Sequence, residues 1–141
     1  MEDSVVSCPQ CSAKNRLKIP AQDQVPICAK CKNPLPWVVA GTDISFRREL
    51  ETSTPVLVDF WAEWCAPCRI TAPVLEDLAR EKAGQIKVVK INVDQNPATS
   101  GQFNIRSIPT MILFRGGQPV ETLVGAMSKD ALLERLNPHL M

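Results

Sequence analysis

Pairs of cysteines at C-x-x-C spacing constrain this chain more than any other feature of its sequence. All six cysteines of the 141 residues belong to such pairs: Cys8/Cys11, Cys28/Cys31 and Cys65/Cys68. Two sulfurs at this spacing can share a metal ion or form a redox-active disulfide. The acidic start, residues 1–4, lacks the basic and apolar regions of a signal peptide. We therefore expect a chain that is not secreted and cysteines that do not form a disulfide scaffold.

Length and composition indicate one folded domain with a small appendage. A chain of 141 residues suits a domain of roughly 100–150 residues. The hydrophobic content of 45% is enough to build a core, which argues against disorder. A net charge of +1 gives no reason to expect a nucleic-acid or anionic-membrane partner. No stretch approaches the roughly 18 apolar residues of a membrane span.

Residues 1–36 differ in composition from the rest of the chain. They contain four cysteines, five prolines, eight larger apolar residues and no aromatic residue. Such a segment cannot bury enough apolar surface to fold without a metal or a cross-link. Residues 33–36 (NPLP) then make a short, stiff junction, because each proline fixes φ and removes a donor. We place a domain boundary here, between a small cysteine-rich unit (1–36) and a larger domain (37–141).

The first two cysteine pairs have the spacing of a four-thiolate zinc site, C-x2-C-x16-C-x2-C. Each pair makes a knuckle that directs two sulfurs at one point, and two knuckles supply the tetrahedral ligands that Zn²⁺ prefers. Four protein ligands leave no open position, so the pattern predicts one structural zinc ion in a zinc ribbon. The expected ligands are Cys8, Cys11, Cys28 and Cys31. Two structural disulfides, or iron in place of zinc, are the alternatives.

The same segment is locally basic. Its cations are Lys14, Arg16, Lys18, Lys30 and Lys32. Nucleic-acid binding would explain them, but a dianionic Zn(Cys)₄ centre needs positive charge nearby. We interpret the five cations as charge compensation and expect no nucleic-acid partner.

From residue 37 onward the pattern alternates between strand and helix. Apolar and β-branched runs predict strands, and the last two are joined by a hairpin turn at 115–118. The strands are expected at residues 37–39, 55–60, 86–93, 110–114 and 120–124. Helical spacing of apolar residues, with Ser128 as a cap, predicts the helices. The helices are expected at residues 43–51, 66–82, 97–103 and 129–136.

Two predicted helices have an expected apolar face. On helix 43–51 we expect Ile44, Phe46 and Leu50 to face inward. On helix 66–82 the residues at helical spacing are Ile70, Val74, Leu75, Leu78 and Ala79. Strands that alternate with helices predict an α/β fold, a central mixed sheet with helices on both faces.

The third pair, Cys65 and Cys68, follows a predicted strand and begins a predicted helix. At a helix N-terminus, free backbone N–H groups and the positive end of the helix dipole favour a thiolate over a thiol. Cys65 comes first and is the expected nucleophile. Cys68 lies one turn later on the same face, close enough to attack a mixed disulfide. A third metal knuckle is the weaker interpretation, because no further cysteine is free to complete it, and the single histidine, His139, argues against Cys–His catalysis.

The sequence around this pair resembles the thioredoxin family. The resemblance covers about residues 37–141. It is carried by VDFWAEWCAPC (58–68), KINVDQNP (90–97), IRSIPT (105–110) and VGA (124–126). With the four N-terminal cysteines, the whole chain is similar to the zinc-bearing thioredoxins of bacteria, often called thioredoxin 2. The resemblance implies a thioredoxin fold and a cytoplasmic, monomeric protein-disulfide reductase. Its implied partners are an NADPH-dependent thioredoxin reductase and disulfide-containing client proteins.

The resemblance also implies roles for the residues that match the family's motifs. Cys65 matches the nucleophile and Cys68 the resolving thiol. Asp59 matches a buried carboxylate that takes the proton of Cys68, and a desolvated carboxyl has the raised pKa that this transfer needs. Lys90 matches the cation beside that carboxylate, and Pro109 matches a cis-proline next to the active disulfide. The residues implied for substrate docking are Trp64, Ala66, Pro67, Ile108, Gly125 and Ala126.

One residue departs from the family's motif. Glycine is usual where Ala66 stands, and alanine fits the first turn of a helix better, so the reduction potential can differ. We expect a potential near the reducing end of the range, because the dipeptide lacks the histidine of oxidase-type motifs. A disulfide oxidase or isomerase is the alternative enzyme. A redox sensor, in which oxidation ejects zinc and unfolds residues 1–36, is an alternative from another class.

Overall fold

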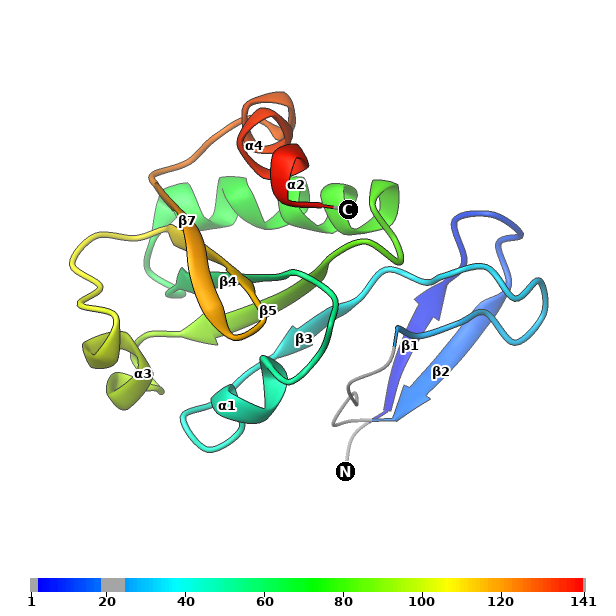
Figure 1. Cartoon of the computed structure of the whole chain (residues 1–141), viewed down its shortest axis with the longest axis horizontal. Helices are drawn as coiled ribbons and strands as arrows, with labels where there is room; N and C mark the ends of the chain where they lie inside the picture. Colours follow the sequence, from blue (N-terminus) through cyan, green and yellow to red (C-terminus); the bar gives the residue numbers. More distant parts are fainter. Residues whose placement is uncertain (1–2, 19–24, 141) are drawn as a thin grey trace.

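The computed structural model describes residues 3–18 and 25–140. Residues 1–2 and 19–24 of the expected N-terminal unit, and residue 141, lie outside the described residues. The described chain contains a two-stranded sheet and a five-stranded sheet. The smaller sheet is an antiparallel hairpin of β1 (Asp3–Ser7) and β2 (Lys14–Lys18), which lies to one side of the larger sheet (Figure 1).

The larger sheet has the strand order β3-β5-β4-β6-β7. Its strands are β3 (Val38–Ala40), β4 (Val56–Trp61), β5 (Lys87–Asn92), β6 (Thr110–Arg115) and β7 (Gln118–Val124). β5 pairs in parallel with β3 and β4, whereas β6 pairs antiparallel with β4 and β7. The predicted mixed sheet is therefore confirmed, and β4 lies at its centre.

Helices cover both faces of this sheet, as predicted (Figure 1). They are α1 (Phe46–Glu49), α2 (Ala66–Glu81), α3 (Pro97–Gln102), α4 (Lys129–Leu136) and the 3-10 turn η1 (Asn137–His139). Leu75 of α2 and Leu132 of α4 pack on Leu57 of the sheet, in one core cluster. Phe46 of α1 and Phe103, which follows α3, pack on the opposite face in a second cluster. No helix of the described residues is long and apolar enough to cross a membrane.

Two residues that we expected to face inward lie on the surface instead. Ile44 is 97% exposed and Ile70 is 66% exposed. Ile44 precedes α1, which begins only at Phe46, because Asp43 is engaged elsewhere: its carboxylate accepts the backbone N–H groups of Ala98 and Thr99. Ile70 lies on the outward face of α2, since the buried residues of that helix follow the line of Thr71, Leu75 and Leu78.

Two features of strand pairing also differ from the expectation. The β1–β2 hairpin was not predicted, because its strands are short and its alternation is interrupted by polar residues. β7 begins at Gln118, so the β6–β7 turn is only Gly116 and Gly117. Both glycines have positive φ, of 58° and 79°, as a tight hairpin turn requires.

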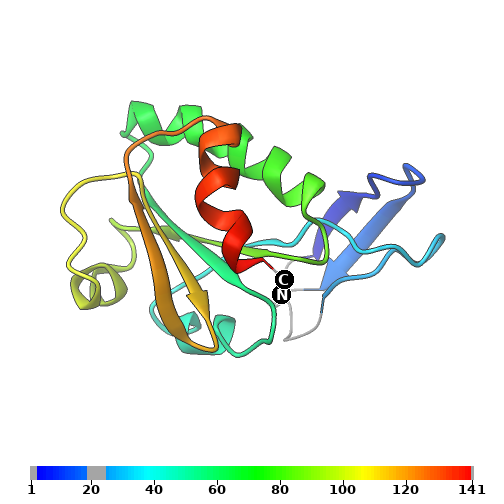
Figure 2. The same ribbon diagram turned by 45° about the horizontal axis from the view of Figure 1, so that its top comes forward.

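The small hairpin lies near the C-terminal end of α2 (Figure 2). A Cβ atom on Gly84, in the turn that follows α2, would lie 2.9 Å from Cβ and Cγ of Pro34. Gly84 also has φ of +88°, a conformation that favours glycine. The sixteen residues of α2 span about 24 Å. The N-terminal unit therefore contacts the larger domain at the end of α2 that is farther from Cys65.

A buried ion pair joins β5, α1 and the start of the larger domain. The side chains of Lys87 and Glu49 are 1% and 5% exposed, and their charged atoms lie 2.9 Å apart. Lys87 Nζ also donates to the backbone oxygen of Glu49 and lies 4.7 Å from the ring centroid of Trp37. Removing one charge of such a pair leaves the other buried without compensation.

We predict that Lys87→Met lowers the free energy of unfolding by about 3–5 kcal/mol, because it strands the Glu49 carboxylate in the core. Urea denaturation measures the loss. The double variant Lys87→Met/Glu49→Gln should recover most of it. Lys129→Met, which removes a more exposed cation paired with Asp77 and Glu81, should cost less than about 1 kcal/mol. A Lys87→Met loss as small as that of the control would contradict the prediction.

Candidate active site and metal centre

The redox-active pair lies where β4 leads into α2. Cys65 is the N-cap of α2, in an extended conformation with φ of −90° and ψ of 106°, and its sulfur accepts the backbone N–H of Cys68 at 3.2 Å. The two residues form a disulfide, with their Cα atoms 5.2 Å apart. Both are 4% exposed. The structure is therefore that of the oxidised protein, and the Cys65 sulfur accepts one of the free N–H groups of the helix start.

A loop from a distant part of the chain covers the disulfide. The carbonyl oxygen of Ile108 lies 3.6 Å from Cys65 Sγ, and the Ile108–Pro109 peptide bond is cis. The backbone N–H of Gly125 donates to the Pro109 oxygen at 2.8 Å, which joins this loop to the end of β7. The structure thus brings Ile108, Pro109 and Gly125 together around Cys65.

The rim of the disulfide is partly apolar and exposed. Trp64 is 67% exposed, and its indole N–H donates to the carboxylate of Asp94 at 2.9 Å. Ala66 and Pro67, in the first turn of α2, are exposed. Ala126 is exposed beside Gly125, which is half-buried. These exposed residues adjoin the buried disulfide along the chain or, for Ala126, follow the Gly125 that bonds to Pro109.

Asp59 is buried in the middle of β4, beneath the helix that holds the pair. It is 2% exposed, and along the strand it alternates with Val58 and Phe60, which pack on the opposite face. Burial raises the pKa of Asp59 to about 6, against the opposing effect of the Lys90 charge. Lys90 is its partner in register on β5. Within the described residues, Oδ1 of Asp59 has no hydrogen-bond partner.

A hollow of about 110 Å³ lies beside Cys68. It is lined by Trp61, Ala62, Glu63, Cys68, Arg69, Ala72 and Lys90. The ammonium of Lys90 lies 5.1 Å from the ring centroid of Trp61. Cys68 and Lys90, the cation that neighbours Asp59, thus border the same small space.

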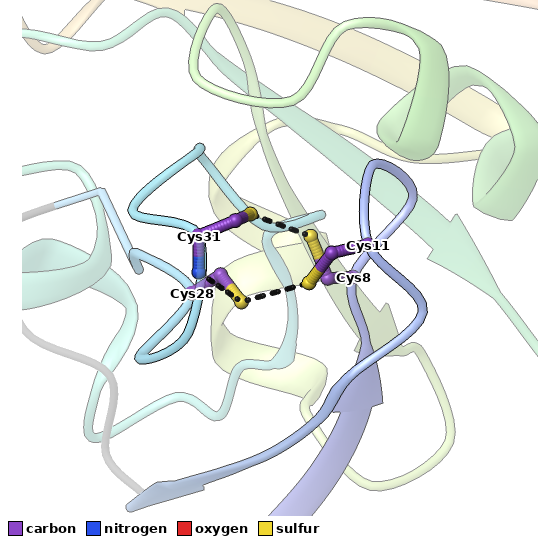
Figure 3. Close-up of side chains that lie close together, drawn as sticks. All are labelled: Cys8, Cys11, Cys28 and Cys31. Atoms are coloured by element: carbon purple, nitrogen blue, oxygen red, sulfur yellow. Dashed lines mark hydrogen bonds between the residues drawn. The ribbon is translucent and has the colours of Figure 1, made fainter.

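The four remaining cysteines converge at one point in the N-terminal unit (Figure 3). Their sulfur atoms all lie within 4.8 Å of one another. Cys8 Sγ lies 3.5 Å from Cys31 Sγ, and Cys11 Sγ lies 3.6 Å from Cys28 Sγ. Four sulfurs at about 2.3 Å from a central Zn²⁺ would be about 3.8 Å apart. The cluster therefore has the size and the donor atoms of a tetrahedral thiolate site and could hold a metal ion.

Comparison with known proteins identifies the larger domain. The thioredoxin family profile matches residues 37–138, which is more than half of the chain. The chain belongs to the thioredoxin family. It is a thiol-disulfide oxidoreductase with Cys65 and Cys68 as its active-site pair.

Individual thioredoxins agree with this assignment. The chain is 53% identical over 102 residues to thioredoxin 1 of Synechococcus elongatus, an alignment that covers 72% of this chain and 95% of the relative. It is 56% identical over 105 residues to a thioredoxin of Mycolicibacterium smegmatis, which covers 72% and 94%. The family match begins at residue 37. This thioredoxin therefore carries an additional N-terminal region with a four-cysteine cluster, as in the zinc-bearing thioredoxin 2 type.

Sequence reasoning missed three polar side chains at the two sites. The Arg69 guanidinium donates twice to the backbone oxygen of Glu63, at 3.0 and 2.7 Å, and so fixes the turn before Cys65. Asp94 holds the indole of Trp64, and Asn15 contacts the cysteine cluster. Asp94 is 30 positions from its partner, and Asn15 is 13 from Cys28. No local sequence signal reports such contacts.

We predict that Asp59→Asn stabilises the oxidised protein increasingly as the pH rises. The folded-state pKa of about 6 lies above the ordinary value of 3.8, so the folded state holds its proton more tightly. Ionisation of Asp59 therefore costs little stability below about pH 4, and this cost grows until the pH passes 6. The gain from Asp59→Asn should increase by up to about 3 kcal/mol between pH 4 and pH 7.5.

Urea denaturation of the oxidised wild type and variant across this range measures the difference. Asp94→Asn, which neutralises a carboxylate near the surface, is the matched control and should show a much smaller trend. A gain from Asp59→Asn that does not change with pH would show that the carboxyl is not desolvated.

Proposed function

We propose that this thioredoxin reduces client disulfides with Cys65 as the nucleophile and Cys68 as the resolving thiol, within a Cys-Ala-Pro-Cys motif. The observation that carries the proposal is the position of the Cys65 sulfur at the N-cap of α2, where it accepts the Cys68 N–H. In the reduced protein the same N–H and the helix dipole stabilise a Cys65 thiolate. Cys68 lies inside the first turn of α2, so its sulfur does not have the N-cap position of Cys65.

The reaction transfers two electrons in two exchange steps. The Cys65 thiolate attacks one sulfur of the client disulfide, forms a mixed disulfide with it, and releases the other client sulfur as a thiolate. The Cys68 thiol then loses its proton and attacks Cys65 Sγ. The Cys65–Cys68 disulfide forms, and the second client sulfur leaves as a thiolate. The client gains two electrons, and the dithiol loses them.

Asp59 is the proposed acceptor of the Cys68 proton. A carboxylate with a pKa raised to about 6 by burial is ionised at neutral pH and still basic enough to take a proton. The charge of Lys90, the register partner of Asp59, opposes the effect of burial on the pKa of Asp59 and so favours the ionised carboxylate. The hollow beside Cys68 is also lined by Lys90, the register partner of Asp59, so we propose that the proton passes from Cys68 to Asp59 through water.

The proposed docking surface is the rim around Cys65. An extended client segment would lie against the backbone of Ile108, next to cis-Pro109, and its side chains would contact Trp64, Ala66, Pro67, Gly125 and Ala126. The residues of this surface are apolar, which suits many different client sequences.

We further propose that Cys8, Cys11, Cys28 and Cys31 hold one zinc ion. Four thiolates at the spacing found here suit Zn²⁺, and a site closed by four protein ligands is structural. Bound zinc supplies the cross-link that a small unit with few apolar residues lacks. The zinc ribbon (1–36) would then fold as a unit beside the thioredoxin domain (37–141).

The cellular setting follows from this chemistry. A reducing compartment keeps the four ribbon cysteines available as metal ligands, so we propose a cytoplasmic location. Oxidised Cys65–Cys68 must be reduced after each turnover. Thioredoxins in general work with a reductase and with client proteins, and we propose an NADPH-dependent thioredoxin reductase as the electron donor of a monomeric protein.

We predict that Cys68→Ser accumulates a mixed disulfide with insulin, because Cys65 still attacks but nothing displaces the client. Non-reducing gel electrophoresis detects the adduct, and dithiothreitol should reduce it to the free proteins. Cys65→Ser is the matched control and should form no adduct and reduce no insulin. Adducts of equal amount with both variants would contradict the assignment of nucleophile and resolving thiol.

We predict one zinc ion per chain in the purified wild type, measured by elemental analysis. Cys28→Ser should lose the metal, because three thiolates bind Zn²⁺ far more weakly than four. Insulin reduction by Cys28→Ser should change by less than about twofold, since the thioredoxin domain has its own core. A wild type free of zinc after preparation with added zinc would overturn the proposed metal centre.

A further inference from the structure

The two cysteine knuckles are copies of one turn. In the first, the Cys8 N–H donates to the Ala13 oxygen at 2.8 Å, and the Ser12 N–H donates to the Cys8 oxygen at 2.9 Å. In the second, Cys28, Lys32 and Asn33 repeat both bonds at 2.9 Å. Ser12 and Lys32 also share a positive φ, of 67° and 69°. Positions in one knuckle therefore have equivalents twenty residues later in the other.

The copies differ at two linked positions. Seven residues after its first cysteine, one knuckle has Asn15, which is 6% exposed, and the other has Leu35, which is 0% exposed. Leu35 packs against the buried cysteines Cys8 and Cys28. One residue after the first cysteine, the copies have Pro9 and Ala29. The second knuckle, where Ala29 has a backbone N–H, is contacted by Asn15. The first knuckle, where Pro9 has none, is contacted by Leu35.

The hydrogen bonds of Asn15 explain this pattern. Its Oδ1 accepts the Ala29 N–H at 2.8 Å, and its Nδ2 donates to Cys28 Sγ, 3.5 Å away, and to the Ala13 oxygen, 3.2 Å away. Asn15 belongs to β2, directly after the first knuckle, whereas Ala29 and Cys28 belong to the second. One buried amide thus connects the two halves of the cysteine cluster.

We propose that Asn15 is a positioning residue of the metal centre. It holds the second knuckle in place against the first and donates a hydrogen bond to a ligand sulfur, so the affinity for the metal depends on it although it is not a ligand. This inference rests on the zinc site proposed above. A bond donated to a thiolate stabilises the negative charge that four thiolates bring to one point, and outer partners of this kind affect metal affinity strongly.

Asn33 provides a natural control. Its side-chain amide also donates to a ligand sulfur, Cys31 Sγ at 3.4 Å, but it is exposed and belongs to the same knuckle as that sulfur. Asn33, like Asn15, therefore donates a hydrogen bond to a ligand sulfur. Unlike that of Asn15, its bond does not connect the two knuckles. A comparison of the two separates these contributions.

The experiment measures the zinc dissociation constant of the full chain by competition with a chromogenic chelator. Asn15→Leu keeps the size of the side chain and removes its polar atoms, and we expect a 10- to 100-fold weaker affinity. Asn33→Leu should change it by less than about threefold. The thiolate-to-metal absorption of the Co²⁺-substituted Asn15→Leu protein should keep the form of a four-sulfur site, because no ligand is lost.

A second variant is needed because a failure of residues 1–36 to fold in Asn15→Leu would itself weaken zinc binding. Asn15→Leu/Ala29→Pro copies the Leu35 and Pro9 combination and so leaves no N–H without an acceptor. We expect its affinity to stay at least about fivefold below the wild type, since the bond to Cys28 is still missing. Wild-type affinity in either variant would overturn the inference. A wild type that binds no zinc would instead overturn the proposed metal centre, and the inference with it.

Discussion

The site depends on the position of β4 at the centre of the five-stranded sheet. This strand pairs with β5 on one side and β6 on the other, which fixes the face to which each of its side chains points. Leu57 and Asp59 point toward the α2 side, and a register slip of one residue would move Asp59 to the opposite face. The same strand delivers the chain to the turn where Cys65 caps α2. A buried carboxylate and a disulfide at a helix N-cap are thus two consequences of one strand's placement.

The sequence predicted most of this arrangement, because its signals are local. The apolar run at 55–60 predicts a strand, and strands that alternate with helices predict a mixed sheet; the central position of that strand is known only from the structure. The C-x-x-C spacing places two sulfurs within one helical turn wherever a helix begins. The four remaining cysteines could be grouped for the same reason, since a knuckle is a local turn and needs no information from the rest of the fold.

What could not be predicted depends on contacts between distant residues. Ile44 fits a helical pattern, yet it is exposed because Asp43 caps the distant helix α3 and delays the start of α1. Asn15 occurs in a polar stretch of the sequence, and its contact with the second knuckle is a bond across the cluster to Ala29. The close approach of Pro34 to Gly84, in the turn that follows α2, is of the same kind. Local periodicity cannot report any of these partners.

The most direct test of the central claim, that Cys65 and Cys68 form a reducing pair, is the equilibrium reduction potential of their disulfide. It is measured against a thiol buffer in the zinc-loaded protein, so that the ribbon cysteines do not contribute. A reductase with Ala66 in its motif should lie at about −260 to −290 mV, near the value of thioredoxins. A potential above about −220 mV would contradict the account, because a pair so easily reduced would favour oxidation or isomerisation of its clients.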